Sequence, residues 1–245
     1  MERQPEPSDL IATTTKRSRA DRNFYLAIAL TIAAVVAVGF GPTANARLFH
    51  PPSPRPLILY VHAALFTAWV LLFFMQAALV RSRRVAWHRR LGVAGIVLGA
   101  LVPVVGVATA LTMTRLNRAE GETGGESFLI IPIFDMLAFA VTFGLAMHWR
   151  RRPEYHRRLL LIASCGLTVA AFARFPGWLM PDDAWYVGVD VLIGAGVARD
   201  WLVMRRVHPV YLYGLPLLVL GQGATMWIYH SGAPAWVATA QILLR

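Results

Sequence analysis

Residues 83–114, RRVAWHRRLGVAGIVLGALVPVVGVATALTMT, place a run of arginines directly before 24 residues that carry no charged side chain. A helix needs about 20 predominantly apolar residues to cross the hydrocarbon core of a bilayer. Backbone polar groups in lipid must be satisfied within their own segment, which a helix achieves. This stretch therefore predicts a membrane-spanning helix that begins at an arginine-rich interface.

The composition of the whole chain agrees with that prediction. Of its 245 residues 57% are hydrophobic and 15% charged, and the mean hydropathy is +0.52. Soluble domains are nearer about 45–50% apolar and about 25% charged, so the composition excludes a soluble enzyme. The net charge of +11 comes from short basic runs between apolar segments, which favours orientation in a bilayer over nucleic-acid binding.

Six further segments are long and apolar enough to cross a bilayer, so we predict an all-α bundle of seven transmembrane helices over residues 24–230. Residues 1–23 are polar and predict a disordered cytoplasmic tail, and residues 231–245 predict an outer interfacial segment. The fifth span is the weakest, because Arg174, Pro176 and Gly177 interrupt it. The seven predicted spans are residues 24–42, 56–80, 91–114, 128–149, 159–180, 184–204 and 209–229.

The basic residues alternate between the two sides of these spans. The tail and the segments 81–90, 150–158 and 199–208 hold 18 of the 24 Lys and Arg residues, and the opposite side holds six. Because cytoplasmic loops carry the excess of Lys and Arg, we expect the N-terminus in the cytoplasm and the C-terminus outside. The predicted location is the bacterial inner membrane.

The junctions between spans repeat. RRVAWHRRL (83–91) and RRPEYHRRL (151–159) share their spacing, and RRVHP (205–209) keeps part of it. A repeated junction predicts one solitary helix followed by three helix hairpins. Near the third junction, Asp200 is expected to pair with Arg205 or Arg206.

Three ionisable residues lie in the outer halves of the helices that enter these hairpins: His62, Asp135 and Asp190. The two aspartates each precede the basic junction by 15 residues, which places them at the same depth. A charge at the centre of a span costs about 2.5–3.5 kcal/mol, so such residues face the bundle interior and mark binding sites.

We therefore expect an outward-facing pocket of His62, Asp135 and Asp190, with Arg174 at its rim and Gln76 as a further polar group. A histidine with two carboxylates suits a divalent metal ion or a small polar ligand, and a metal-bound water would be the nucleophile if the site is catalytic. Two alternatives stay open: an ion pair between Arg174 and an aspartate that only locks the bundle, and a proton-coupled transporter.

A different cofactor is conceivable at the cytoplasmic side. His88 and His156 occupy equivalent places in the repeated junctions, and paired imidazoles from two helices are the axial ligands that haem b requires. The simpler interpretation is that these rings contact lipid phosphate or the returning chain.

Several other functions are excluded. Lys16, in the tail, is the only lysine, so the chain has no intramembrane Schiff-base lysine for retinal. Cys165 is the only cysteine, so no intrachain disulfide forms. The sequence has no Walker A, G-x-S-x-G, H-E-x-x-H or C-x-x-C motif. No motif in it indicates a particular enzymatic reaction.

Several of these motifs together carry a resemblance. HAALFTAW (62–69), Gln76, WHRRLG (87–92), RPEYHRRL (152–159) and RVHP (206–209) resemble a widespread group of uncharacterised bacterial seven-span proteins. The resemblance covers about residues 24–230 and implies a seven-helix inner-membrane protein whose relatives have no established activity. The His-Arg-Arg-Leu-Gly junction is also similar to that of cytochrome b561-like membrane proteins, which implies haem b.

Overall fold

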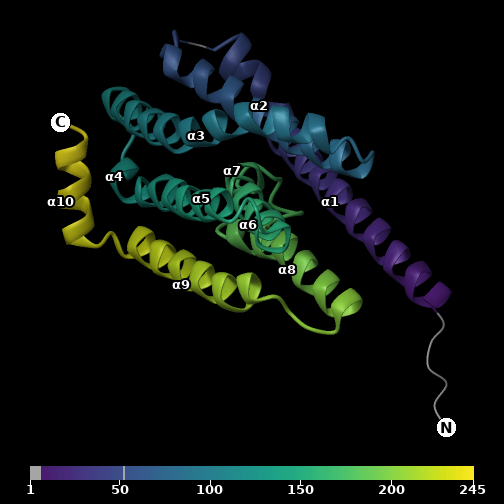
Figure 1. Cartoon of the computed structure of the whole chain (residues 1–245). Helices are drawn as coiled ribbons and strands as arrows, with labels where there is room; N and C mark the ends of the chain where they lie inside the picture. The colour runs from purple at the N-terminus through teal and green to yellow at the C-terminus, as the bar shows by residue number, and fades with distance from the viewer. Residues whose placement is uncertain (1–6, 52) are drawn as a thin grey trace.

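The computed structural model describes residues 7–51 and 53–245, with side chains from Arg22 onward, and the regular secondary structure of these residues is entirely helical. The helices are α1 (Pro7–Ala44), the π-helical η1 (Asn45–Phe49), α2 (Leu57–Arg81), α3 (Val85–Ala119), α4 (Gly125–Phe128), α5 (Ile130–His148), α6 (Pro153–Gly166), α7 (Val169–Phe172), α8 (Trp185–Met204), α9 (Pro209–Ser231) and α10 (Pro234–Leu243) (Figure 1).

Four helical stretches within the described residues are long and apolar enough to cross a membrane. They are Arg22–Phe49, Leu57–Arg81, Val85–Ala119 and Gly125–His148. Each contains the apolar window that about 30 Å of hydrocarbon requires. The chain is therefore a helical membrane protein, and these stretches correspond to the first four predicted spans.

The first helix is longer than the sequence indicated. α1 begins at Pro7, inside the segment 1–23 for which a disordered tail was expected, whereas residues 1–6 lie outside the described residues. After Pro7 the chain has no proline or glycine before Gly39, so no residue stops the helix from extending outward from its apolar part. The structure therefore has a helix over residues 7–23, where a disordered tail was expected.

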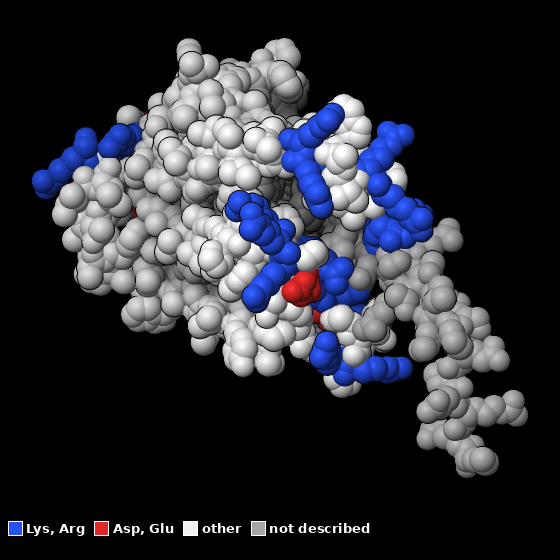
Figure 2. All heavy atoms as spheres, viewed as in Figure 1, with Lys and Arg blue, Asp and Glu red and all other residues white. Residues whose placement is uncertain are grey.

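The later helices form pairs joined by short basic turns. α2 and α3 meet at residues 82–84, α5 and α6 at 149–152, and α8 and α9 at 205–208, and the helices of each pair pack together. α8 ends at Met204, and the left-handed backbone of the next residue, Arg205 (φ 54°), reverses the chain. On the face that Figure 2 shows, the blue arginine side chains gather mainly toward the right of the bundle, where the α8–α9 turn lies in Figure 1.

The fifth predicted span, residues 159–180, is not one helix. α6 ends at Gly166, α7 occupies Val169–Phe172, and the chain continues without a helix until Trp185. The Thr168 hydroxyl donates a 2.6 Å hydrogen bond to the Cys165 carbonyl, and Pro176 and Gly177 oppose any continuation. The broken segment packs beside α1 and α8.

A glycine sets the distance between α1 and this segment. A Cβ on Gly39 would lie 2.4 Å from the Ala171 carbonyl oxygen and 2.8 Å from the Ala171 Cα. The backbones of α1 and α7 therefore touch at a position that admits no side chain, as small residues allow in membrane bundles. This contact fixes the residues that follow α7.

The C-terminal segment docks at the end of the bundle opposite the basic turns, on the left in Figure 1. The Arg115 guanidinium donates hydrogen bonds to the carbonyls of Leu243 (2.9 Å) and Leu244 (3.2 Å). The Trp236 indole donates to the Glu126 carbonyl at 2.9 Å. These bonds hold α10 beside α4 and the end of α3.

Candidate intramembrane polar site

A tyrosine interacts with two of the three predicted pocket residues, Asp135 and Asp190. The Tyr186 hydroxyl on α8 donates a 2.9 Å hydrogen bond to Oδ1 of Asp135 on α5, and it interacts electrostatically with Asp190. The Gln222 amide on α9 donates to Oδ1 of Asp190 at 3.1 Å. Three helices thus contribute to one polar cluster, which we call the carboxylate cluster: Asp135, Tyr186, Asp190 and Gln222.

Helix periodicity and close packing position this cluster. Tyr186 and Asp190 are four residues apart on α8 and therefore lie on the same face of that helix. The Phe134 ring meets the Tyr186 ring edge-on and fills the space where a Cβ on Gly221 of α9 would lie, 2.6 Å from the ring. α5, α8 and α9 therefore converge at the level of the carboxylates.

The carboxylate cluster holds no compensating positive charge. Among the side chains described from Arg22 onward, no Arg or His forms an ion pair with Asp135 or Asp190. Tyr186 and Gln222 are buried, at 7% and 4% exposed, and both aspartates are partly buried. A carboxylate inside a membrane bundle without a basic partner is costly, so it tends to take up a proton or bind a cation.

The third predicted ligand lies elsewhere. His62 stacks on Phe66 within α2, and its electrostatic neighbour is Arg174 rather than either aspartate. Across the residues with described side chains, no three His, Cys, Asp or Glu residues group closely enough to hold a metal ion. The structure therefore does not assemble the metal site of His62, Asp135 and Asp190, because α2 packs against α1 and α3 and stays away from α8.

Gln76 and Arg174 are also outside the carboxylate cluster. Gln76 lies at the seam of α2 and α3, where its side-chain nitrogen is near Gly92 and its backbone carbonyl meets His88. The Arg174 guanidinium packs over the Phe40 ring of α1. The expected ion pair between Arg174 and an aspartate is therefore not formed.

Known proteins give no further guide to this arrangement. No family model, curated protein or solved structure matches the chain. Any function must therefore be inferred from the chemistry of the side chains of this chain.

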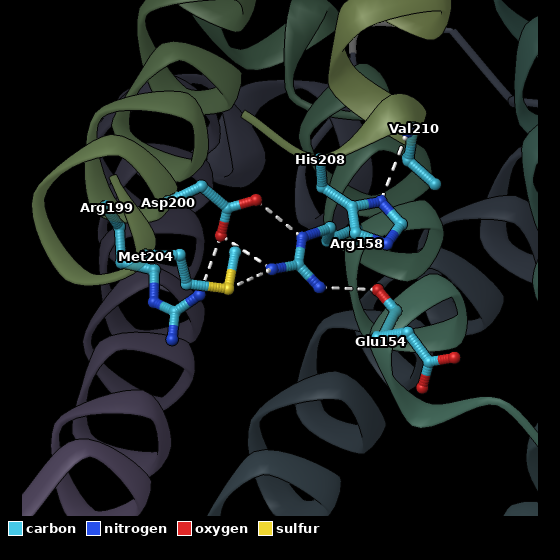
Figure 3. Close-up of polar contacts among 7 residues, drawn as sticks. All are labelled: Glu154, Arg158, Arg199, Asp200, Met204, His208 and Val210. Carbon is cyan, nitrogen blue, oxygen red and sulfur yellow. Dashed lines mark hydrogen bonds and ion pairs between the residues drawn. The ribbon is translucent and has the colours of Figure 1, made fainter. Parts of the chain in front are cut away.

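A buried ion pair at the basic end was missed by the sequence analysis. Arg158 donates from Nε to Oδ2 and from Nη2 to Oδ1 of Asp200, both at 2.7 Å (Figure 3). Arg199 donates to the same Oδ1 at 2.6 Å, and Arg158 Nη1 donates to the Glu154 carbonyl. Asp200 therefore pairs across helices with Arg158 and with its neighbour Arg199, in place of Arg205 or Arg206.

The surroundings of this pair link three helices. Arg158 is fully buried, and although burial alone would lower its pKa, the Asp200 carboxylate holds that pKa above its usual value. His208 accepts a hydrogen bond from the Val210 amide at Nδ1 and so caps α9. Burial, followed by the charge of Arg158, lowers the pKa of His208.

The junction histidines contact the returning chain. Nδ1 of His156 lies 2.9 Å from the Ala146 carbonyl of the preceding helix, α5. The His88 ring interacts with the Gln76 carbonyl of its preceding helix, α2. The charges of the two rings also interact, and Nδ1 of His88 is buried with no hydrogen-bond partner. Each of these two junction histidines thus lies against a backbone carbonyl of the helix that precedes it.

Proposed function

We propose that the chain is a bacterial inner-membrane protein with seven crossings, an N-terminus in the cytoplasm and a C-terminus outside. The gathering of the basic turns at one end supports this orientation, because cytoplasmic segments retain Lys and Arg. α8, α9 and the broken segment of α6 and α7 would supply the remaining three crossings. Polar side chains in these helices are buried in the bundle and make hydrogen bonds there, as Asp200 does with Arg158 and Gln222 does with Asp190.

We propose further that the carboxylate cluster binds a small cation, of which the proton is the simplest, and that this binding serves the uptake of a small polar ligand. The observation that carries the proposal is that Asp135 and Asp190 are each held by a buried neutral donor, Tyr186 and Gln222, without a described basic partner. Intramembrane carboxylates of this kind are the groups that proton-coupled carriers use.

Each member of the cluster has a defined part in that binding. Tyr186 and Gln222 donate hydrogen bonds that fix one oxygen of each carboxylate and leave the other oxygens to accept a proton or coordinate a cation. Protonation or cation binding would neutralise these carboxylates, so the bundle would exist in a charged and a neutral state.

Infrared difference spectroscopy of the purified protein across a pH titration tests this proposal directly. A protonated carboxyl has a carbonyl stretching band that a carboxylate lacks. We expect such a band in the wild-type protein, and we expect Asp135→Asn or Asp190→Asn to abolish it. Asp183→Asn is the matched control, because Asp183 is exposed and lies beside His230 outside the cluster.

Two results would contradict the proposal. One is a spectrum in which neither cluster aspartate changes the band. The other is an unchanged rate of proton uptake by proteoliposomes carrying Asp135→Asn, where the wild-type protein takes up protons under an imposed pH gradient. Thermal unfolding of each variant shows whether a changed signal reflects the loss of proton binding or a protein that no longer folds.

A second candidate function rests on the unpartnered Nδ1 of His88. We propose that His88 and His156 could hold a haem b, since the carbonyl contact of His156 uses Nδ1 and leaves Nε2 for a metal. Bound haem would supply one-electron transfer. The two histidines would fix its position between the first and second hairpins.

The optical spectrum of the membrane-extracted protein tests this candidate. Haem absorption that is lost in His88→Ala and in His156→Ala, and kept in His230→Ala, supports it. A colourless protein that also fails to bind added haemin excludes it. That result would leave both rings as contacts between the turns and their preceding helices.

A further inference from the structure

Arg174 holds a positive charge in the half of the bundle opposite the basic turns. Its guanidinium lies 4.4 Å above the centroid of the Phe40 ring, and Nη1 donates a short hydrogen bond to the Ala170 carbonyl. Nε is inaccessible to solvent and has no hydrogen-bond partner. The described contacts of this side chain are therefore one carbonyl and one aromatic face.

The local fold leaves this side chain little freedom. The backbone contact between Gly39 and Ala171 fixes α7 against α1, and Arg174 follows Ala171 by three residues, just after α7 ends at Phe172. Phe40, the residue after Gly39, lies directly under the guanidinium. The same close approach that joins the two helices therefore determines where Arg174 projects.

Two more basic groups accompany Arg174. His62 on α2 and Arg47 on η1 both interact electrostatically with it. Nδ1 of His62 is buried without a hydrogen-bond partner. No Asp or Glu among the described side chains forms an ion pair with any of the three. We call these residues, Arg47, His62 and Arg174, the basic cluster.

The basic cluster lacks the counter-charge that its position demands. An arginine stays protonated in a protein, and its cationic plane is suited to phosphate and carboxylate groups. Removing such a charge from water without a partner costs several kcal/mol, whereas an anion that accepts charge-assisted hydrogen bonds offsets this cost. An anion could accept hydrogen bonds from the unpartnered Nε of Arg174 and, in the tautomer that carries its proton there, from Nδ1 of His62, once the side chains around these buried atoms admit it.

We propose that the basic cluster binds a phosphate or carboxylate group that enters from the end opposite the basic turns. Two sources share this chemistry: the phosphodiester of an anionic lipid beside α1 and α2, and a soluble anion. Arg174 is the anchor, His62 contributes a second donor, and exposed Arg47 attracts the anion. This site is separate from the carboxylate cluster, so either proposal can fail without the other.

Thermal unfolding of the full chain in a neutral detergent tests the proposal. The probes are inorganic phosphate, acetate and short-chain phosphatidylglycerol, each compared with chloride at equal ionic strength and with short-chain phosphatidylcholine. We expect at least one anionic probe to raise the unfolding temperature in a saturable way. Arg174→Gln should weaken its apparent affinity about tenfold or more, as the loss of a charge-assisted hydrogen bond predicts.

The variants include a matched control. Arg118→Gln removes an exposed arginine at the same end of the bundle, one that faces Glu126 at 3.6 Å, and it should leave probe affinity unchanged. If Arg174→Gln does not fold, Arg174→Lys and His62→Gln still test the site. Lysine keeps the charge and loses the planar donor set, so we expect weaker binding of the same probe.

The outcomes separate the sources. A response to phosphate or acetate that depends on Arg174 identifies a soluble anion, and a response confined to phosphatidylglycerol identifies a lipid. The proposal is overturned if no anion acts beyond chloride. It is equally overturned if Arg174→Gln, Arg174→Lys and His62→Gln all bind the probes as tightly as the wild-type protein.

Discussion

Arg158 and Asp200 face each other side-on, with two 2.7 Å hydrogen bonds between them, and both residues are 0% exposed. The pair ties α6 to α8 at the basic end of the bundle. Arg199 adds a third bond to the same carboxylate, so two arginines share one aspartate. A charge in this position is tolerated because its partner is fixed in planar, bidentate geometry.

Removing the carboxylate should therefore be costly. Asp200→Ala leaves the Arg158 guanidinium buried without an acidic partner, which we expect to lower the free energy of unfolding by about 3–5 kcal/mol. The measurement is denaturant unfolding in mixed micelles. Glu120→Ala is the control, since its pairing with Arg55 at 3.4 Å is partly exposed and should contribute less than about 1 kcal/mol.

A paired replacement separates packing from charge. Arg158→Met with Asp200→Leu removes both charges and retains apolar volume, so the double variant should be more stable than Asp200→Ala alone. A double variant as unstable as the single one would contradict this account. It would mean that Arg158 acts mainly through the Glu154 carbonyl and Met204, its other contacts.

Two neighbouring glycines test the α1–α7 contact. Gly39→Ala would place a Cβ 2.4 Å from the Ala171 carbonyl oxygen, against backbone that cannot rotate away, and we expect a loss of about 1–3 kcal/mol. Gly41→Ala meets nothing within 4 Å and should be neutral or stabilise the helix by about 0.5–1 kcal/mol. Equal unfolding temperatures for the two variants would show that α1 and α7 do not approach so closely.

The helical class and four long apolar helices follow from hydropathy, because length and apolar content are local properties of the sequence. The break after Gly166 does not, since it depends on a side-chain bond from Thr168 and on packing against α1. The hydropathy of residues 159–180 measures only how apolar the segment is. It does not show where a helix within the segment ends. The start of α1 was missed because polar composition was taken as disorder, although no residue there breaks a helix.

The surroundings of the candidate residues depend on packing that the sequence pattern does not encode. Equal depth along the helices led to Asp135 and Asp190, because depth is set by position in the sequence. Their donors Tyr186 and Gln222 depend on how α5, α8 and α9 converge, and His62 lies apart because α2 packs with α1 and α3. Tyr186 was detectable from its four-residue spacing to Asp190, and the His-Arg-Arg motif contained Arg158 without indicating its partner.

Acid should weaken the contact between α5 and α6. Burial lowers the pKa of His156 below its usual 6.5, although the hydrogen bond with the Ala146 carbonyl acts in the opposite direction. Because the folded protein favours the neutral ring, the unfolded chain binds more protons at mildly acidic pH. The contribution of His156 is therefore complete above pH 6.5 and is lost as the pH falls through the folded pKa.

The pH dependence of unfolding for His156→Asn checks this sign. Asparagine can still donate to the Ala146 carbonyl and does not titrate. We expect the wild-type protein to lose more stability than the variant between neutral pH and mildly acidic pH, and the difference to vanish above pH 7. A steeper loss in the variant would mean that the protonated ring is the form that the fold favours.

Labelling of single cysteines in intact cells tests the proposed orientation. Cys165 is buried and 0% exposed, so the wild-type protein should not react with a membrane-impermeant maleimide and provides the blank. Ser82→Cys lies in the exposed basic turn between α2 and α3, and Glu122→Cys in the exposed segment at the opposite end. With the basic turns in the cytoplasm, Glu122→Cys is labelled in intact cells and Ser82→Cys only after the cells are opened. The reverse pattern would place the N-terminus outside, and labelling of both positions in intact cells would exclude a crossing by α3.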